Sequence, residues 1–287
     1  MNPGPSQTDR FLQALRSPGA IRAVELRPPP AALGMGASVE AWIDLRHSVR
    51  RLLREDRFVL FTDDAVGTRE EESLRHLVDN LGPGADLSGV VPFLTLRHSL
   101  DYCTYFARRT RGHGMGGLTV TGGDEAGGTP RCLPRSRDLR AQIREGTPGL
   151  PLGVWTNPLA DPETQVGYLT DEGVAADYFL TQVVSHHHLP AVDRFLEVVQ
   201  GAGVTMPGLF GVFYYRSANP RTLERLGEFL PVPTEALTRE FSSGAAPEEV
   251  CARTLRALRE RGVEKVYLCN LDLRSAPGTL ARIEALV

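Results

Sequence analysis

The feature that most constrains the fold is an alternation of short apolar runs with longer stretches of helical periodicity along all 287 residues. Apolar runs of about four to eight residues bounded by turn residues are typical of buried strands. Strands separated by helices pair in parallel, because each right-handed crossover returns the chain to the same end of the sheet. The predicted strands cover residues 21–27, 58–63, 90–96, 117–122, 151–157, 178–184, 207–215 and 266–271.

The helical stretches complete this pattern, and Ser38 is expected to cap the first of them. A barrel of eight such units typically needs about 250 residues, so length and strand number favour a closed barrel over an open sheet. We therefore expect an α/β fold: a single-domain (β/α)8 TIM barrel over residues 1–287, with extra helices before the last strand and a polar extension or helix at 1–16. The predicted helices cover 39–55, 69–81, 100–111, 136–145, 162–174, 189–201, 220–230, 234–241, 247–261 and 278–286.

Composition excludes several classes of protein. A net charge of −3 argues against a nucleic-acid partner, which would require a basic face. The chain has no apolar run of about 18 residues, so no membrane partner is expected. Its polar start lacks the apolar core of a signal peptide, which predicts a cytoplasmic protein. Lys265 is the only lysine, so no P-loop motif exists, and the four cysteines form no C-x-x-C pair.

Polar and aromatic residues gather at the predicted strand ends. In (β/α)8 barrels the active site lies at the carboxyl ends of the strands. Carboxylates and amides there could bind the edge of a planar heterocycle, and aromatic rings could cover its face. These residues are Glu25, Thr62, Asp63, Asp64, Thr95, Asp124, Glu125, Asn157, Gln182, Tyr214, Tyr215, Asn270 and Asp272.

Two carboxylates are the sharpest candidates. Glu25 lies between Val24 and Leu26, so desolvation should raise its pKa and suit it to general acid catalysis near neutral pH. The alternative is a strand-end Glu that faces solvent. Asp124 follows Gly122 and Gly123, which would let a ligand approach the backbone closely. Its alternative is a turn or helix-capping Asp.

Two other motifs resemble binding sites without the required context. Gly112, Gly114 and Gly117 spell G-x-G-x-x-G, but they precede a predicted strand where a dinucleotide fingerprint would follow one. The run 186–188 holds three histidines, whose consecutive side chains should point in different directions. We therefore expect a polar loop and no metal site there, leaving a metal-dependent hydrolase as a minor alternative.

Three motifs in order resemble the methylenetetrahydrofolate reductase family. They are VELRPP at 24–29, GGD at 122–124 and ADYFLTQ at 176–182, supported by Pro207-Gly208 and by Tyr267 with Asn270. The resemblance covers nearly the whole chain and implies a (β/α)8 barrel. It also implies reduction of 5,10-methylenetetrahydrofolate to 5-methyltetrahydrofolate by a reduced nicotinamide, usually through bound FAD.

The resemblance also implies roles for individual residues. Glu25 would be the general acid that helps to open the methylene bridge to the reactive iminium. The pterin edge would be bound by Asp124 and Gln182, and Tyr215 would stack on the folate or nicotinamide ring. Expected cofactor-binding residues at neighbouring strand ends are Thr62, Thr95, Tyr214 and Asn157.

The departures from the family pattern cluster around its flavin site. Gly122 replaces an Arg, Phe93 replaces a His, and Asp171 replaces a Lys, while residues 157–162 differ from the family's loop. An Asp beside a pyrophosphate would repel it. We therefore expect NADH or NADPH to act directly without FAD, as in the flavin-independent branch reported among actinobacterial relatives. The alternatives are an FAD-dependent reductase and a non-catalytic folate- or nucleotide-binding barrel.

Overall fold

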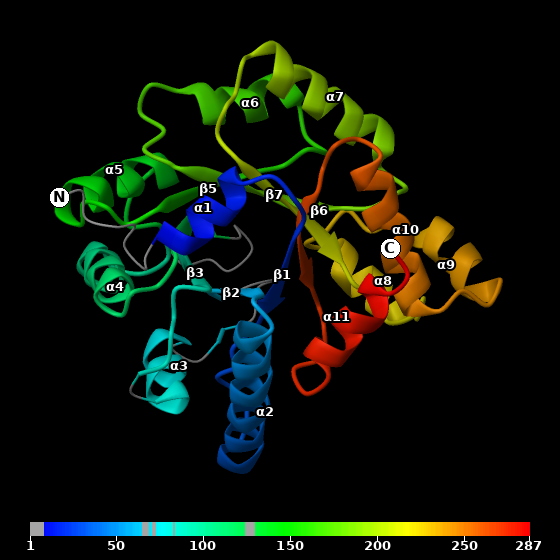
Figure 1. The fold of residues 1–287 in the computed structure, drawn as a ribbon, viewed down its shortest axis with the longest axis horizontal. Helices are drawn as coiled ribbons and strands as arrows, with labels where there is room; N and C mark the ends of the chain where they lie inside the picture. Colours follow the sequence, from blue (N-terminus) through cyan, green and yellow to red (C-terminus); the bar gives the residue numbers. More distant parts are fainter. Residues whose placement is uncertain (1–8, 65–68, 71–72, 83, 124–129) are drawn as a thin grey trace.

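In the computed structural model, which describes residues 9–64, 69–70, 73–82, 84–123 and 130–287, the strands form a closed parallel barrel (Figure 1). The pairing of Ile21 with Lys265 joins the first strand to the last and confirms a single-domain (β/α)8 barrel. The strands are β1 (Ile21–Leu26), β2 (Phe58–Phe61), β3 (Val90–Thr95), β4 (Leu118–Thr121), β5 (Leu152–Thr156), β6 (Tyr178–Val184), β7 (Gly208–Phe213) and β8 (Lys265–Cys269).

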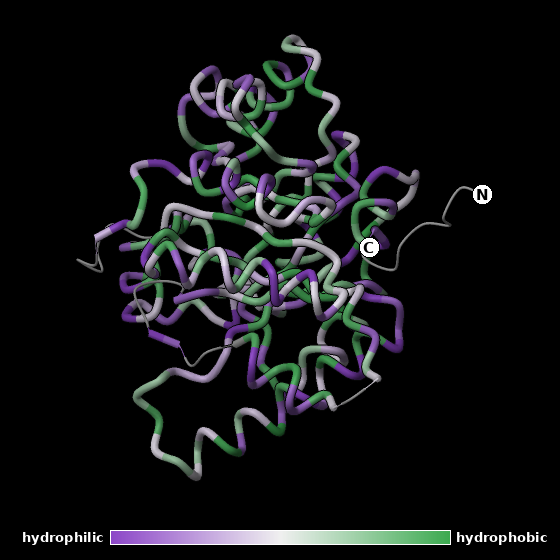
Figure 2. The backbone as a smooth tube through the Cα atoms, turned by 90° about the vertical axis from the view of Figure 1, so that its left-hand side faces the viewer, coloured by the Kyte–Doolittle hydropathy of each residue, from purple (hydrophilic) through white to green (hydrophobic). Residues whose placement is uncertain are grey.

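Helices surround the barrel, and three of them lie between β7 and β8, as expected. A large apolar layer joins the strands to the helices that cover them. In Figure 2 the apolar colour runs through the central strands, and polar segments gather in the outer loops. The helices are α1 (Arg10–Arg16), α2 (Met35–Arg54), α3 (Ser73–Leu81), α4 (Leu100–Gly112), α5 (Ser136–Gly146), α6 (Pro162–Thr170), α7 (Leu189–Gly201), α8 (Pro220–Gly227), α9 (Thr234–Ser242), α10 (Pro247–Arg259) and α11 (Ala276–Glu284).

Three helix boundaries differ from the expectation. The N-cap of α2 is Gly34, so Ser38 lies inside the helix and is buried. The helix α3 is described from Ser73, and Glu70 lies outside it because it forms a β-bridge with Pro30. The helix α6 ends at Thr170 because the backbone of Asp171 is non-helical and its carboxylate accepts a hydrogen bond from the Gly173 amide.

The barrel interior is filled by large aromatic side chains. The Tyr178 hydroxyl lies 3.0 Å from Thr119 Oγ1, and the Tyr267 hydroxyl donates to the Thr181 carbonyl at 2.6 Å. Both rings need glycine on a neighbouring strand. A Cβ at Gly153 would lie 2.4 Å from the Tyr178 ring, and one at Gly211 would lie 2.5 Å from the Tyr267 hydroxyl. The interior is therefore a packed core.

The helix α1 closes the end of the barrel where the strands begin. Phe11 is fully buried and makes edge-to-face contacts with Phe58 at 5.1 Å and Tyr178 at 5.2 Å, and these two residues begin β2 and β6. Leu12 and Leu15 are buried beside it, while Gln13 is exposed. The N-terminal helix is therefore part of the barrel core (Figure 1).

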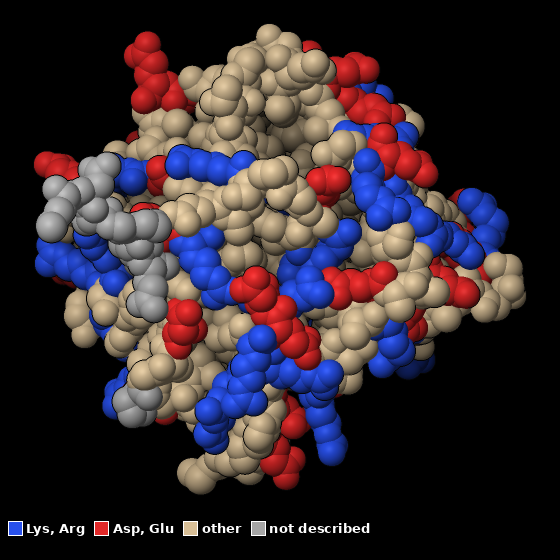
Figure 3. All heavy atoms as spheres, in the orientation of Figure 1, with Lys and Arg blue, Asp and Glu red and all other residues tan. Residues whose placement is uncertain are grey.

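The surface carries both signs of charge in alternation. On the face drawn in Figure 3, basic and acidic side chains are interspersed. Several form ion pairs, including Arg57 with Glu284 at 2.7 Å and Arg51 with Glu55 at 2.8 Å. Among the described residues, no helix combines the length and apolar character needed to cross a bilayer.

The first prediction concerns the packing of α1. Phe11→Ala should destabilise the protein by about 3–5 kcal/mol, because it leaves a cavity between the Phe58 and Tyr178 rings. Denaturant unfolding followed by circular dichroism measures this loss. Gln13→Ala on the exposed side of α1 is the matched control and should change stability by less than about 0.5 kcal/mol. Equal stability of the two variants would show that α1 is not part of the cooperative core.

Candidate functional site

A cavity of about 300 Å³ lies at the carboxyl end of the barrel. Residues from seven of the eight strands reach it, and the segment around the end of α8 covers one side. Its lining combines acidic, amide and aromatic side chains. The lining residues are Glu25, Arg27, Thr62, Phe93, Thr121, Gly122, Gly123, Trp155, Gln182, Val183, Phe213, Leu226, Phe229, Leu230, Tyr267, Cys269 and Asn270.

Glu25 points into this cavity from β1. Its pKa is raised to about 7, chiefly by burial; the Arg27 guanidinium opposes this shift, and the nearby carboxylate of Glu70 adds to it. This agrees with the expectation from its apolar neighbours. A carboxyl group with a pKa near 7 is partly protonated at neutral pH, so it can donate a proton to a bound ligand.

A second buried carboxylate, Glu70, lies beside this group. It accepts hydrogen bonds from Thr62 Oγ1 at 2.8 Å, from Arg27 Nε at 2.9 Å and from the Asp64 amide at 3.0 Å. Burial also raises its pKa to about 7. Glu70 was not among the predicted site residues, because it follows β2 within a segment expected to be helical and does not lie at a strand end. Arg27 acts on both carboxyl groups, so Glu70 and Glu25 belong to one cluster of interacting charges.

Gln182 reaches the cavity from a point where strand pairing is irregular. The register between β6 and β7 shifts between Leu180 and Val183, and such irregularities re-aim side chains beside active sites. The Gln182 Oε1 atom accepts a hydrogen bond from the Val183 amide at 2.8 Å. In this assignment of the amide, its NH₂ group remains to donate to a ligand.

The aromatic walls come from residues outside the predicted binding set, although Phe93 was noted as a departure from the family pattern. Phe93 and Trp155 meet edge to face at 6.0 Å, and Phe213 and Phe229 lie elsewhere in the lining. Alternation along the strand could have identified Phe213: because Phe213 faces the interior, the next residue, Tyr214, faces outward.

Neither predicted tyrosine lines the cavity. Tyr214 is buried in the outer apolar layer, with its hydroxyl directed to Glu248 of α10. Tyr215 follows the end of β7 and is buried with Leu223 and Leu237 beneath α8 and α9. The cavity therefore takes its stacking surfaces from phenylalanine and tryptophan.

The remaining predicted residues have different placements. Thr62 lines the cavity and donates to Glu70. Thr95 is buried outside the lining, and its Oγ1 has no hydrogen-bond partner among the described residues. Asn157 shapes the β5–α6 turn, where its Oδ1 accepts from the Leu159 amide at 3.1 Å. Asp124 and Glu125 lie outside the described residues.

Two arginines flank the glycines after β4. The Arg131 Nη2 atom donates to the Gly123 carbonyl at 3.2 Å, and a Cβ at Gly123 would lie 2.9 Å from Arg97 Nε. Gly123 also has a φ of +74°, which strongly favours glycine. This edge of the cavity therefore places positive charge beside exposed backbone, an arrangement suited to an anionic ligand group.

The charge reversal at Asp171 is compensated locally. Its carboxylate is paired with the Arg137 guanidinium, and Asp171 does not line the cavity. The Arg137 cation beside Asp171 offsets its negative charge, so the expected repulsion of a pyrophosphate is weakened. Of the departures from the family pattern, Phe93 and Gly122 do line the cavity.

The glycine motif at 112–117 has a packing role, as its position before a strand indicated. Gly114 adopts a φ of +69° after α4, and a Cβ at Gly116 would lie 2.3 Å from the Ser88 carbonyl oxygen. These residues connect α4 to the closed end of the barrel, away from the cavity. The motif is therefore explained without a dinucleotide.

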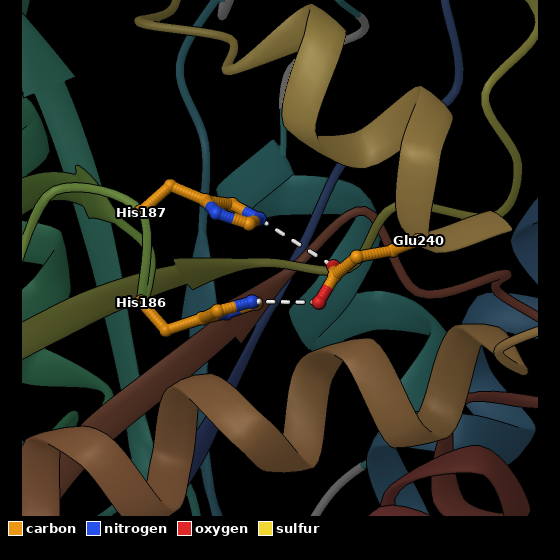
Figure 4. Close-up of side chains that lie close together, drawn as sticks. All are labelled: His186, His187 and Glu240. Carbon is orange, nitrogen blue, oxygen red and sulfur yellow. Dashed lines mark hydrogen bonds and ion pairs between the residues drawn. The ribbon is translucent and has the colours of Figure 1, made fainter. Parts of the chain in front are cut away.

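The histidine run differs from the expectation. His186 and His187 both point toward Glu240 of α9, with ring centroids 3.9 Å apart (Figure 4). Side chains alternate only while the chain is extended, and β6 ends at Val184. The turn that follows is closed by a hydrogen bond from the His188 amide to the Ser185 carbonyl at 2.9 Å. It brings adjacent side chains to the same side.

Comparison with known proteins establishes the fold. No protein-family model matches the sequence, and no curated protein shows significant similarity to it. One similar structure is an uncharacterised protein from Clostridium thermocellum that binds two copies of 5-methyl-5,6,7,8-tetrahydrofolic acid. It has a TM-score of 0.66 and 12% identity over 96% of this chain and 98% of that one. An F420-dependent secondary alcohol dehydrogenase in complex with an F420-acetone adduct has a TM-score of 0.52 and 10% identity, over 94% and 98%.

The second prediction follows from the raised pKa values of Glu25 and Glu70. Above the ordinary carboxyl pKa, the unfolded chain loses these protons while the folded protein keeps them until about pH 7. The free energy of unfolding should therefore fall as pH rises from 5 to 8. Glu25→Gln should reduce this fall by about 1–3 kcal/mol.

Denaturant unfolding at several pH values measures the difference between the variant and the wild type. Glu40→Gln, at an exposed position of α2, is the matched control and should keep the wild-type pH profile. Parallel profiles for Glu25→Gln and the wild type would contradict a raised pKa at Glu25.

Proposed function

We propose that this protein reduces 5,10-methylenetetrahydrofolate to 5-methyltetrahydrofolate, with NADH or NADPH as the hydride donor. The observation that carries the proposal is Glu25, a carboxyl group with a pKa of about 7 in an aromatic-walled cavity. The motifs around Glu25 and Gln182 resemble the corresponding family motifs. The similar fold of a protein that binds 5-methyltetrahydrofolic acid also supports a folate ligand.

The cavity suits one bicyclic heterocycle. Its volume of about 300 Å³ is at the lower end of ligand sites, which range over roughly 300–1,000 Å³. The faces of a pterin would contact the aromatic walls, and the Gln182 NH₂ group would donate to an acceptor at its edge. Asp124 is proposed to bind the same edge on the strength of the resemblance.

Glu25 would act on the folate itself. Protonation of a bridge nitrogen by Glu25 would weaken its bond to the methylene carbon and open the bridge to an iminium. The iminium carbon would then accept a hydride, one proton with two electrons, which a bound nicotinamide would supply. Glu70 holds Arg27 at 2.9 Å and so limits how strongly that cation favours ionisation of Glu25.

The residues at the cavity edge fit a dinucleotide donor. Arg97 and Arg131 beside Gly123 would offer positive charge to its diphosphate, and Thr62 lies in the lining. We also propose that FAD is not held tightly. Support comes from Phe93 and Gly122, which occupy lining positions where flavin-containing relatives have a His and an Arg.

The third prediction tests the chemistry. The purified protein should oxidise NADH or NADPH only when methylenetetrahydrofolate is present. Glu25→Gln should lower kcat by about 10²–10⁴-fold, because the amide cannot donate the proton that opens the bridge. Glu40→Gln is the control and should keep wild-type turnover. An unchanged rate in Glu25→Gln would remove the general-acid role.

Binding without turnover is the outcome that favours a non-catalytic barrel. A rise in Tm with methyltetrahydrofolate would report binding by mass action. If this rise occurs while no nicotinamide is oxidised under any folate condition, the reductase proposal fails and a folate-binding role replaces it.

The fourth prediction concerns flavin. The protein as purified should lack flavin absorbance in the visible range, and added FAD should not increase the rate of nicotinamide oxidation. Phe93→His with Gly122→Arg would restore two of the residues found in flavin-containing relatives and should increase FAD affinity. A yellow wild-type protein with stoichiometric flavin would overturn direct transfer while leaving the role of Glu25 intact.

A further inference from the structure

We propose that His186, His187 and Glu240 form a binding site for a divalent cation of the zinc class, separate from the cavity. Figure 4 shows the two imidazole rings, from the turn after β6, directed at the Glu240 carboxylate of α9. One ligand atom from each residue lies within 4.8 Å of the others. Two imidazoles with one carboxylate are a common ligand set for zinc.

The distances fit a single metal ion. His186 Nε2 lies 3.0 Å from Glu240 Oε1, and His187 Nε2 lies 3.4 Å from Glu240 Oε2. Zinc binds nitrogen and oxygen ligands at about 2.0–2.2 Å in tetrahedral geometry, which places neighbouring ligand atoms about 3.3 Å apart. Because one ligand atom from each residue already lies within 4.8 Å of the others, rotation of the side chains would bring the three atoms around one ion.

Two of these ligand atoms make no hydrogen bond to a described residue, although they pair with each other as ions when His187 is protonated. His187 Nε2 and Glu240 Oε2 are buried and make no hydrogen bond within the described part of the chain. Leaving such atoms unsatisfied is costly, and they lie 3.4 Å apart in a geometry that forms no hydrogen bond. A cation between them would satisfy both atoms at once.

The surrounding residues already orient the ligands. Thr254 Oγ1 lies 2.9 Å from His186 Nδ1, so the Nε2 atom of this ring faces the carboxylate. Arg253 Nη1 donates at 2.7 Å to Glu240 Oε1, the oxygen that lies beside His186, and Oε2 lies toward His187. Such outer contacts fix ring and carboxylate orientation at metal sites. Three protein ligands leave a fourth position for water or a small ligand.

A cation at this site would connect the α8–α9 segment, whose first part lines one side of the cavity, to the barrel. Glu240 lies in α9, which follows α8 and the lining residues Leu226, Phe229 and Leu230. The histidines come from the turn after β6, four and five residues after Gln182. A bound cation would therefore hold the α8–α9 segment against the strand that carries Gln182 into the cavity.

The fifth prediction tests the site with the full chain freed of metal by EDTA and dialysis. Zn²⁺ should bind with 1:1 stoichiometry in isothermal titration and raise Tm, and Co²⁺ should give visible absorption bands of low-coordinate geometry. His187→Gln and Glu240→Gln should each weaken binding by at least about 10-fold, since even outer-shell losses cost this much. Each should also abolish the rise in Tm.

The third histidine provides the matched control. His188 belongs to the same run but lies outside the cluster, with Nδ1 3.2 Å from Ser185 Oγ. His188→Gln should bind Zn²⁺ like the wild type, which separates the proposed site from general binding to a histidine run or to cysteines. Equal affinity in the wild type and in both ligand variants, or equal losses in all three variants, would overturn the proposal. Melting in EDTA shows that each variant is folded.

Discussion

Closure of the parallel barrel is the constraint on which the rest of the structure depends. Once β1 pairs with β8, every inward side chain shares one interior, which must be filled or left as a cavity. Tyr178 and Phe11 fill the end where the strands begin. Tyr267 is fully buried in the interior and is also part of the cavity lining, so the packed core ends where the candidate site begins.

This geometry explains why carboxyl groups can keep protons here. Glu25 and Glu70 are withdrawn from water at the open end of the interior, and both are near one guanidinium, Arg27. One cation cannot fully offset the desolvation of two carboxylates, so both pKa values rise. The arrangement costs stability at neutral pH, and such local costs are expected at functional sites.

The sequence was sufficient for features that depend on local periodicity. The strand and helix order follows from spacing along each segment, and the closed barrel follows from the number of strands and the length of the chain. It was insufficient where a shift of one residue places a side chain on the other face of a strand, as with Phe213 and Tyr214 at the end of β7. It was also insufficient for contacts between distant segments, such as Arg137 with Asp171, which change the local charge. The predicted directions of the His186 and His187 side chains were wrong for a related reason: side chains alternate only along a strand, and β6 ends before these residues.

The long connection from β7 to β8 relates the two proposed sites to each other. Its first part lines the cavity through Leu226, Phe229 and Leu230, and its next helix carries Glu240 to the histidines. A folate in the cavity and a cation at Glu240 would both favour the same position of this segment. By thermodynamic linkage, any such coupling is reciprocal, so each would increase the affinity for the other by the same factor. The α8–α9 segment is therefore the element through which the cavity and the cluster can communicate.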